Sequence, residues 1–267
     1  MNRFTPVKIL VIIVLIYVLA CIFARLVSEG MVFQPPPPSY GETAPDLIFI
    51  PTDDPGLPGL AALHLKNPEA KYLFLHFHGN GEDLGMTRWW LEQARAQGFE
   101  VLAVDYRGYG LSGGSPSERA YYADAAAVVV HCRDKLGWKP ERIIVHGRSL
   151  GGAAAARIAA RNPVAALIVE NAFVSAYRVM TARPVLLGDR FETIDDMMKP
   201  LCPVLVIYSK EDEVVGAWHG PALFAAAPEP KQLWAVEGAG HNDLLSVTGE
   251  NYWQRIRQFV DGLPPQP

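Results

Sequence analysis

Short apolar runs alternate with segments of helical composition along most of the chain. Six runs rich in Val, Ile and Phe lie at residues 72–77, 99–105, 142–147, 165–170, 203–209 and 232–237. Runs of this length without polar alternation are typical of strands buried on both faces. Helical segments follow them, at residues 83–97, 117–136, 149–161, 172–182, 217–227 and 249–261. The alternation predicts an α/β fold in which helices cover both faces of a mostly parallel central sheet.

Two further apolar runs precede this alternation. Residues 47–51 and 60–65 flank the turn-rich stretch 52–59, which predicts a hairpin at one edge of the sheet. The pattern shows no second core. We therefore expect one domain over residues 47–262, followed by a short C-terminal tail over residues 263–267.

The N-terminal part of the chain is much more hydrophobic. Residues 9–24 are sixteen apolar residues without a break, and with Arg25 tolerated the run reaches Val27. At a rise of about 1.5 Å per residue, residues 9–27 would form a helix of about 28 Å, close to the thickness of a bilayer core. We expect this helix to span a membrane. Four consecutive prolines within residues 28–46 then predict a stiff, extended linker.

The charges before the apolar segment predict its orientation. Arg3 and Lys8 precede it, so the positive-inside rule leaves residues 1–8 in the cytoplasm and the domain on the far side of the membrane. Two alternatives stay open. The segment could be a signal peptide whose cleavage releases the domain, or the protein could be a lipoprotein anchored through Cys21, because residues 18–21 resemble a lipobox.

Composition excludes several classes of function. Half of the residues are hydrophobic, 19% are charged and the net charge is −4, which argues against a disordered chain and against a nucleic-acid partner. The three cysteines are too few and too widely spaced for a disulfide framework or for a zinc site with paired cysteines. The sequence assigns no oligomeric state.

Residues 147–151 read Gly-Arg-Ser-Leu-Gly and match the pattern G-x-S-x-G. They lie between a predicted strand and a predicted helix, where a tight turn would lift the Ser149 hydroxyl to the carboxyl end of the sheet. Glycines on both sides let the strand and the helix approach closely. A structural turn in which Ser149 caps the helix is the alternative. The position directly after a strand favours a nucleophile.

A serine nucleophile needs a base and an acid that orients the base. In sheets of this kind the acid and then the histidine follow the serine along the chain. Asp212 and His241 each come directly after a later predicted strand, in that order. We therefore predict Ser149, Asp212 and His241 as a catalytic triad. Glu170, at the end of another strand, is the alternative acid.

Attack on a carbonyl also needs two N–H donors for the developing oxyanion. One comes from the residue after the nucleophile and the other from a loop after an early strand. Residues 76–83 form such a loop, so the backbone N–H groups of Asn80 and Leu150 are the predicted donors. We expect His78 to brace this loop rather than to transfer protons.

One glycine pattern points to a different chemistry. Gly108, Gly110 and Gly113 fit G-x-G-x-x-G, which is typical of dinucleotide binding. No helix opens at the third glycine, and no acidic residue ends a strand about 20 residues later. We interpret this stretch as a structural loop held by an ion pair between Asp105 and Arg107.

Five motifs, FHGNGED, VDYRGYGLSGG, VHGRSLGG, VENAF and GAGHND, occur in this order. Together they resemble the alpha/beta-hydrolase superfamily, and in detail its small membrane-anchored branch of alpha/beta-hydrolase domain-containing proteins. That branch includes serine esterases, protein depalmitoylases and serine aminopeptidase-like proteins. The resemblance covers residues 47–262. It implies a triad, borne here by Ser149, Asp212 and His241, that cleaves an acyl ester, thioester or amide without a metal or organic cofactor.

The space for a lid is limited. Only residues 180–198 are available for one, so we expect a small lid and an open site. Such a site suits a membrane-presented acyl substrate as well as a small ester. Two other functions stay open: a serine peptidase with the same fold and triad, and a catalytically silent, membrane-tethered binding protein.

Overall fold

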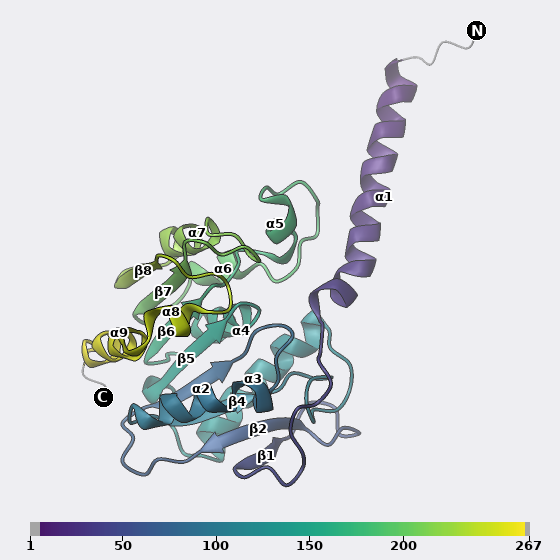
Figure 1. The fold of residues 1–267 in the computed structure, drawn as a ribbon. Coiled ribbons are helices and arrows are strands. Elements are labelled where there is room, and N and C mark those ends of the chain that lie inside the picture. Colours follow the sequence, from purple (N-terminus) through teal and green to yellow (C-terminus); the bar gives the residue numbers. More distant parts are fainter. Residues whose placement is uncertain (1–5, 265–267) are drawn as a thin grey trace.

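An eight-stranded sheet forms the centre of the domain in the computed structural model, which describes residues 6–264 (Figure 1). Its strands are β1 (Leu47–Ile50), β2 (Leu60–Leu65), β3 (Leu73–Phe77), β4 (Glu100–Val104), β5 (Ile143–Arg148), β6 (Ala166–Glu170), β7 (Val204–Ser209) and β8 (Lys231–Val236). The order across the sheet is β1-β2-β4-β3-β5-β6-β7-β8. Strands β3 to β8 are parallel, whereas β2 pairs antiparallel with both β1 and β4. The prediction of a mostly parallel α/β sheet is confirmed.

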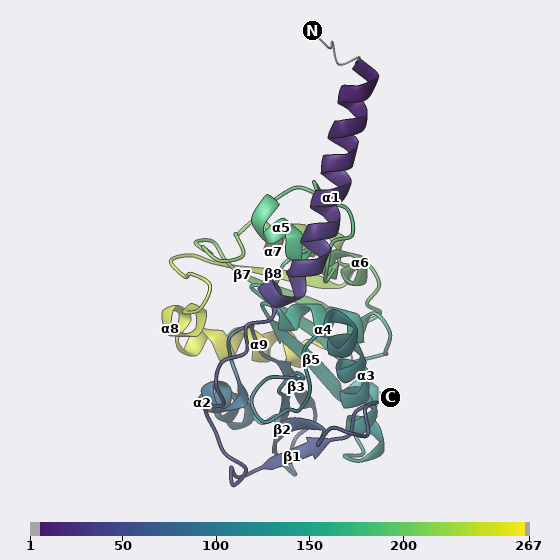
Figure 2. The same ribbon diagram turned by 90° about the vertical axis from the view of Figure 1, so that its right-hand side faces the viewer.

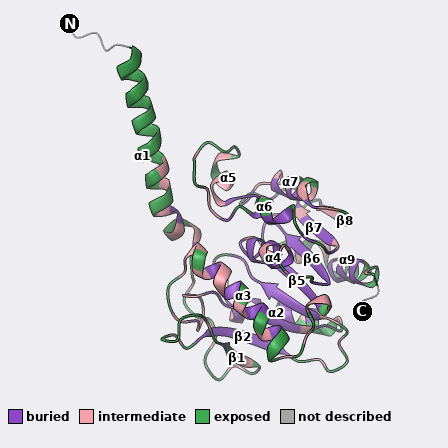
Figure 3. Ribbon diagram, turned by 180° about the vertical axis from the view of Figure 1, so that it is seen from behind, coloured by how far each residue is buried: buried purple, intermediate pink, exposed green. Residues whose placement is uncertain are grey.

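Helices cover both faces of this sheet. One face carries α3 (Glu118–Asp134), α4 (Gly151–Ala159), α6 (Thr193–Met197) and α7 (His219–Ala226), and the other carries α2 (Leu84–Ala96), α8 (Leu244–Thr248) and α9 (Glu250–Asp261). Each face has its own buried apolar core, and the strands between them are buried along most of their length (Figure 3). This explains why the strands lack polar alternation. Two short helices, α5 (Ala176–Thr181) and a 3₁₀ turn (Pro140–Arg142), complete the elements.

Helix α1 (Pro6–Val32) projects away from the domain (Figures 1 and 2). Its apolar side chains are exposed, so it is not a core helix (Figure 3). Its length and composition are compatible with a membrane anchor, and a signal sequence would share both. The helix runs beyond the predicted segment 9–27 and ends shortly before Pro35, because prolines cannot continue it. Parts of the predicted N-terminal segment and tail, residues 1–5 with Arg3 and residues 265–267, lie outside the described residues.

The parallel strands place the predicted site residues at one edge of the sheet. Asn80 follows β3, Ser149 follows β5, Asp212 follows β7 and His241 follows β8. All four therefore lie beyond the carboxyl ends of parallel strands, where sheets of this type bind their ligands.

Candidate active site

Ser149 lies in a tight turn between β5 and α4. Its backbone φ is 51°, a left-handed conformation that non-glycine residues rarely adopt. The Ser149 N–H donates to the Glu170 carbonyl over 2.8 Å, which holds the turn against β6. A methyl group on Gly147 would lie 2.2 Å from the Gly151 carbonyl oxygen, and one on Gly151 would lie 2.0 Å from that of Phe77. Both glycines are therefore required for this turn.

The structure brings the three predicted triad residues together. His241 Nε2 lies 3.0 Å from Ser149 Oγ, and His241 Nδ1 lies 2.8 Å from Asp212 Oδ2. The other Asp212 oxygen accepts the backbone N–H groups of Val214 and Val215. Burial alone would raise the pKa of Asp212, but the hydrogen bonds from His241 and from these N–H groups outweigh it and lower the pKa. Asp212 is therefore an ionised carboxylate that can orient the imidazole.

Glu170, the alternative acid, makes a different set of contacts. Its carboxylate accepts a hydrogen bond from the Tyr252 hydroxyl, and it lies 3.6 Å from His146 Nε2 and 3.5 Å from Arg148 Nε. Burial would raise the pKa of Glu170, but these neighbours lower it. The structure therefore brings Asp212, and not Glu170, to the histidine.

The predicted oxyanion donors lie on two adjoining loops. A methyl group on Gly79 would lie 3.6 Å from the Ser149 Cβ, so the loop after β3 touches the serine turn. The Tyr121 hydroxyl donates to the Leu150 carbonyl over 2.7 Å and helps to fix the orientation of that residue. Among residues 6–264, no hydrogen bond occupies the backbone N–H of Asn80 or Leu150. Both groups are therefore available as donors.

His78 supports the loop after β3 from behind. It is fully buried, with Nδ1 2.7 Å from the Gly79 carbonyl oxygen and Nε2 3.1 Å from Asp105 Oδ1. This position suits the expected bracing role. The predicted ion pair between Asp105 and Arg107 is wrong. Asp105 is buried and faces His78, whereas Arg107 donates to Asp124 on α3 over 2.8 Å.

Sequence comparison shows the family. Residues 68–191 match a family model described as serine aminopeptidase, S33. The matched range includes Ser149 and ends before Asp212 and His241. Alpha/beta hydrolase domain-containing protein 17B of Xenopus tropicalis is 39% identical over 197 residues, which is 73% of this chain and 68% of that protein. The human protein 17B is 38% identical over the same shares of both chains. The chain belongs to the alpha/beta-hydrolase domain-containing protein family.

Solved structures show the same fold for this hydrolase. The Pyrococcus furiosus esterase Pf2001 aligns with a TM-score of 0.72 and 19% identity, over 86% of this chain and 99% of that chain. A monoacylglycerol lipase of Paleococcus ferrophilus aligns with a TM-score of 0.61 and 18% identity, over 76% and 98%. The resemblance to the alpha/beta-hydrolase superfamily is confirmed.

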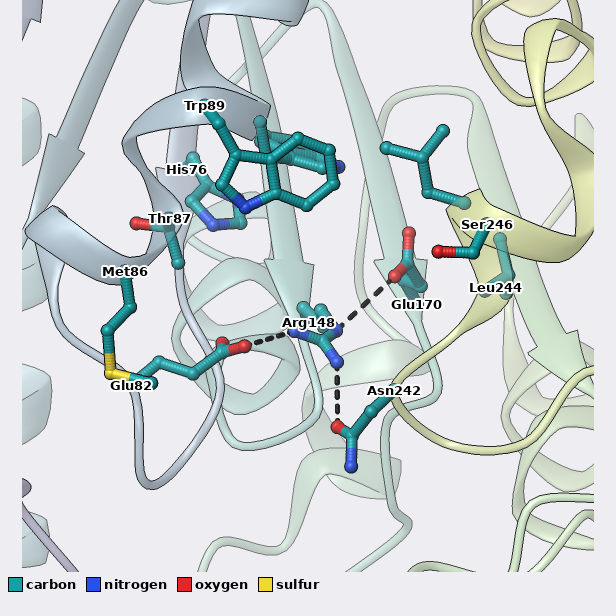
Figure 4. A pocket seen from close by; sticks show the side chains of 12 residues that line it. His76, Glu82, Met86, Thr87, Trp89, Arg148, Glu170, Asn242, Leu244 and Ser246 are labelled. Atoms are coloured by element: carbon teal, nitrogen blue, oxygen red, sulfur yellow. Dashed lines mark hydrogen bonds and ion pairs between the residues drawn. The ribbon is translucent and has the colours of Figure 1, made fainter.

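Arg148, the last residue of β5 and the residue before Ser149, links the loop after β3 to the loop after β8 (Figure 4). It forms an ion pair with Glu82 in the loop after β3, and Glu82 Oε2 accepts the Gly79 N–H over 2.8 Å. Arg148 also donates to Asn242 Oδ1 over 2.8 Å and to the His241 carbonyl over 3.4 Å. We name Arg148, Glu82 and Asn242 the arginine clamp. The sequence analysis missed it, although a charged residue inside the motif was a visible signal.

A small cavity adjoins the arginine clamp (Figure 4). It has a volume of about 90 Å³, and its lining residues include His76, Trp90, Arg148 and Asn242 but not Ser149. It is therefore a space behind the clamp rather than part of the serine site. Within residues 6–264, no group of three or more His, Cys, Asp or Glu side chains is placed to hold a metal ion.

Replacing Arg148 by alanine is expected to lower kcat about 10- to 100-fold, because a shift of about 1 Å in catalytic groups can cost that much. KM should change by less than about twofold. Arg148→Lys should keep only part of the wild-type kcat, because an ammonium group cannot bind several acceptors in the fixed planar geometry of a guanidinium. Steady-state hydrolysis of p-nitrophenyl butyrate measures both constants. Arg88→Ala, which removes an arginine of α2 paired with Asp46, is the matched control. An equal loss in that control, or a change in KM alone, would contradict the clamp.

Proposed function

We propose that this hydrolase cleaves an acyl ester or thioester, with Ser149 as the nucleophile and an acyl-enzyme intermediate. The observation that carries the proposal is the hydrogen-bonded chain from Ser149 through His241 to Asp212, with lengths of 3.0 and 2.8 Å. Nucleophile, base and orienting acid are thus within reach of one another before substrate binds. The esterase and the lipase among the structural neighbours support the same class of reaction.

The geometry accounts for each proton in this reaction. His241 Nε2 accepts the hydroxyl proton of Ser149 while Oγ attacks the carbonyl carbon, and the N–H groups of Asn80 and Leu150 stabilise the oxyanion. As the intermediate collapses, the bond to the leaving alcohol or thiol breaks, and His241 returns its proton to that group. Water then attacks the acyl-enzyme in the same way and releases the carboxylic acid and free Ser149. Asp212 stays ionised throughout and stabilises the imidazolium.

The proposal includes a membrane location for the domain. The exposed apolar surface of α1 supports a single-pass anchor, and Lys8 before the apolar run supports an orientation with the domain outside the cytoplasm. In this arrangement the anchor keeps the serine site close to the membrane.

A serine peptidase is the second candidate. The family model that matches residues 68–191 is described as a serine aminopeptidase, and the same triad can attack an amide carbonyl. The two candidates differ in the leaving group that the site accepts.

A substrate panel separates these functions. Purified full-length protein in detergent is expected to cleave p-nitrophenyl esters and acyl thioesters with a kcat/KM at least about 100-fold above that for aminoacyl p-nitroanilides. Loss of this activity in Ser149→Ala, run in parallel, assigns it to the proposed site. A preference for the anilides would support the peptidase instead. Folded protein that cleaves neither class would support a silent binding protein.

A further inference from the structure

The segment between β6 and α6 exposes large apolar side chains. Met180 on α5 is 78% exposed, and Val185 and Leu187 in the following loop are 52% and 68% exposed. More than half of each of these residues is therefore left uncovered by the rest of residues 6–264. The loop reads Arg-Pro-Val-Leu-Leu-Gly over residues 183–188, so three apolar residues form its tip. We name residues 176–188 the apolar lid. Exposed apolar patches of this kind mark interaction sites.

The apolar lid lies beside the anchor helix, as two perpendicular views show (Figures 1 and 2). The Leu187 N–H donates to Cys21 Sγ over 3.4 Å. One turn further along α1, Arg25 Nη1 donates to the Gly188 carbonyl over 3.1 Å. The tip of the lid is therefore held at the level of Cys21, inside the apolar run.

Further contacts fix α1 on the domain, so this level is defined. Arg190, at the base of the lid, lies 3.2 Å from Glu29 Oε1 and 3.1 Å from Glu118 Oε2. Phe33, just after the helix, is only 5% exposed, and its ring centroid lies 5.6 Å from that of Phe191. These contacts join the end of the anchor, the lid and α3 into one packed unit.

The level of Cys21 sets the depth of the lid in a membrane. Cys21 precedes Val27, the end of the predicted spanning segment, by six residues, so it lies about 9 Å inside that end along the helix axis. Segments that bind at the membrane interface bury their apolar face by about 5–10 Å. Leu187, beside Cys21, thus reaches the acyl-chain region. Arg183 can extend its charged end to the lipid phosphates.

The lid also contacts Trp218, at the end of the segment that carries Asp212. Arg178 on α5 stacks over the Trp218 ring, with its guanidinium carbon 5.0 Å from the ring centroid. Trp218 follows the loop that carries Asp212, and its neighbour His219 accepts the Val174 N–H over 3.0 Å. The lid therefore lies between the anchor and the loop that holds the catalytic acid.

We propose that the apolar lid inserts into the lipid leaflet on the domain's side and guides long acyl chains from the bilayer to Ser149. The route rests on the proposed acyl-hydrolase function, and the insertion rests on the proposed membrane anchor. The arrangement favours long-chain esters or thioesters dissolved in a membrane over water-soluble esters, because the tip of the lid lies at the level of the lipid chains.

The depth of residue 187 tests the insertion directly. Full-length Cys21→Ser, Leu187→Cys protein is labelled with the fluorophore NBD and placed in phosphatidylcholine nanodiscs. Cys132 and Cys202 should stay unlabelled at pH 7, because burial raises the pKa of each thiol to about 12. Val130→Cys in the same background is the control, since Val130 is 47% exposed on α3.

The label at position 187 is expected to emit at shorter wavelength than the control and to be quenched by doxyl groups on the lipid chains. Emission and quenching equal to those of the control would overturn the insertion. That result would indicate instead that the apolar lid binds a protein partner. The labelled protein keeps the native residues of the serine site, so its hydrolysis of p-nitrophenyl acetate reports separately on the proposed function.

A paired activity assay tests the route. Val185→Asp combined with Leu187→Asp is expected to lose at least about tenfold in rate on a long-chain acyl thioester carried in phosphatidylcholine vesicles, since each aspartate opposes insertion into lipid. Its rate on soluble p-nitrophenyl acetate should equal that of the wild type, which also shows that the variant folds. Val130→Asp should lose neither rate. An equal loss on both substrates, or no loss on the vesicle substrate, would overturn the route.

Discussion

Replacement of Ser149 by alanine is expected to lower kcat for ester hydrolysis by about 10⁴- to 10⁶-fold, the range seen when a triad serine is removed. The reason is that His241 Nε2 then faces no hydroxyl group and no acyl-enzyme can form. Fold and stability should change little, because the strained backbone at position 149 is held by its own N–H and by the neighbouring glycines. Rates of p-nitrophenyl butyrate hydrolysis, with circular dichroism as a check of folding, measure the effect.

Ser115→Ala is the matched control for this experiment. Ser115 is an exposed serine in the loop before α3 and lies outside the site. Its replacement should leave kcat within about twofold, as is usual for surface changes of this size. Activity retained by Ser149→Ala at the level of this control would contradict the assignment of the nucleophile.

Replacement of Asp212 by asparagine is expected to lower kcat by about 10³- to 10⁴-fold, because the amide can no longer hold His241 in the tautomer that accepts the serine proton. Glu170→Gln should lower kcat far less, since Glu170 contacts Arg148 and Tyr252 rather than His241. Steady-state kinetics of the two variants side by side measure the difference. A larger loss in Glu170→Gln than in Asp212→Asn would assign the orienting acid to Glu170.

The pH dependence follows from the same contacts. The pKa of Asp212 is lowered by its hydrogen bonds from His241 and from backbone N–H groups. The Asp212 carboxyl group is therefore ionised at any pH above about 3.9, the usual pKa of an aspartate. As the pH falls from about 3.9 toward the lowered pKa of the folded protein, the unfolded state binds the proton more readily and stability is lost. Changes in kcat/KM between about pH 5 and 8 therefore do not come from Asp212.

The sequence predicted the positions of the strands well, because strands buried on both faces leave continuous apolar runs. It did not predict that β2 pairs with β4, or that β4 lies between β2 and β3, since pairing depends on contacts between distant segments. Helices α6 and α8 have five residues each, too few to show a helical period. The helix predicted over residues 172–182 is only six residues long, because Ser175 is extended and Ala182 takes a left-handed conformation two residues before Pro184.

The meeting of Ser149, Asp212 and His241 could be predicted because their order along the chain and their places at strand ends follow from the topology of the sheet. The arginine clamp could not. Its members come from the end of β5 and from two loops, and their meeting depends on side-chain directions that the sequence pattern does not contain. The error at Arg107 has the same origin. Proximity in sequence favoured Asp105 as its partner, whereas the backbone turn directs Asp105 inward and leaves Arg107 to Asp124.

Labelling with a fluorophosphonate probe tests the central claim most directly, because the probe forms a bond only with a serine that is activated as a nucleophile. Detergent-solubilised, full-length protein is treated with the probe, and the modified peptide is identified by mass spectrometry. We predict a single adduct, on Ser149, and none in Ser149→Ala. An adduct on another residue, or no adduct on folded wild-type protein, would contradict the account.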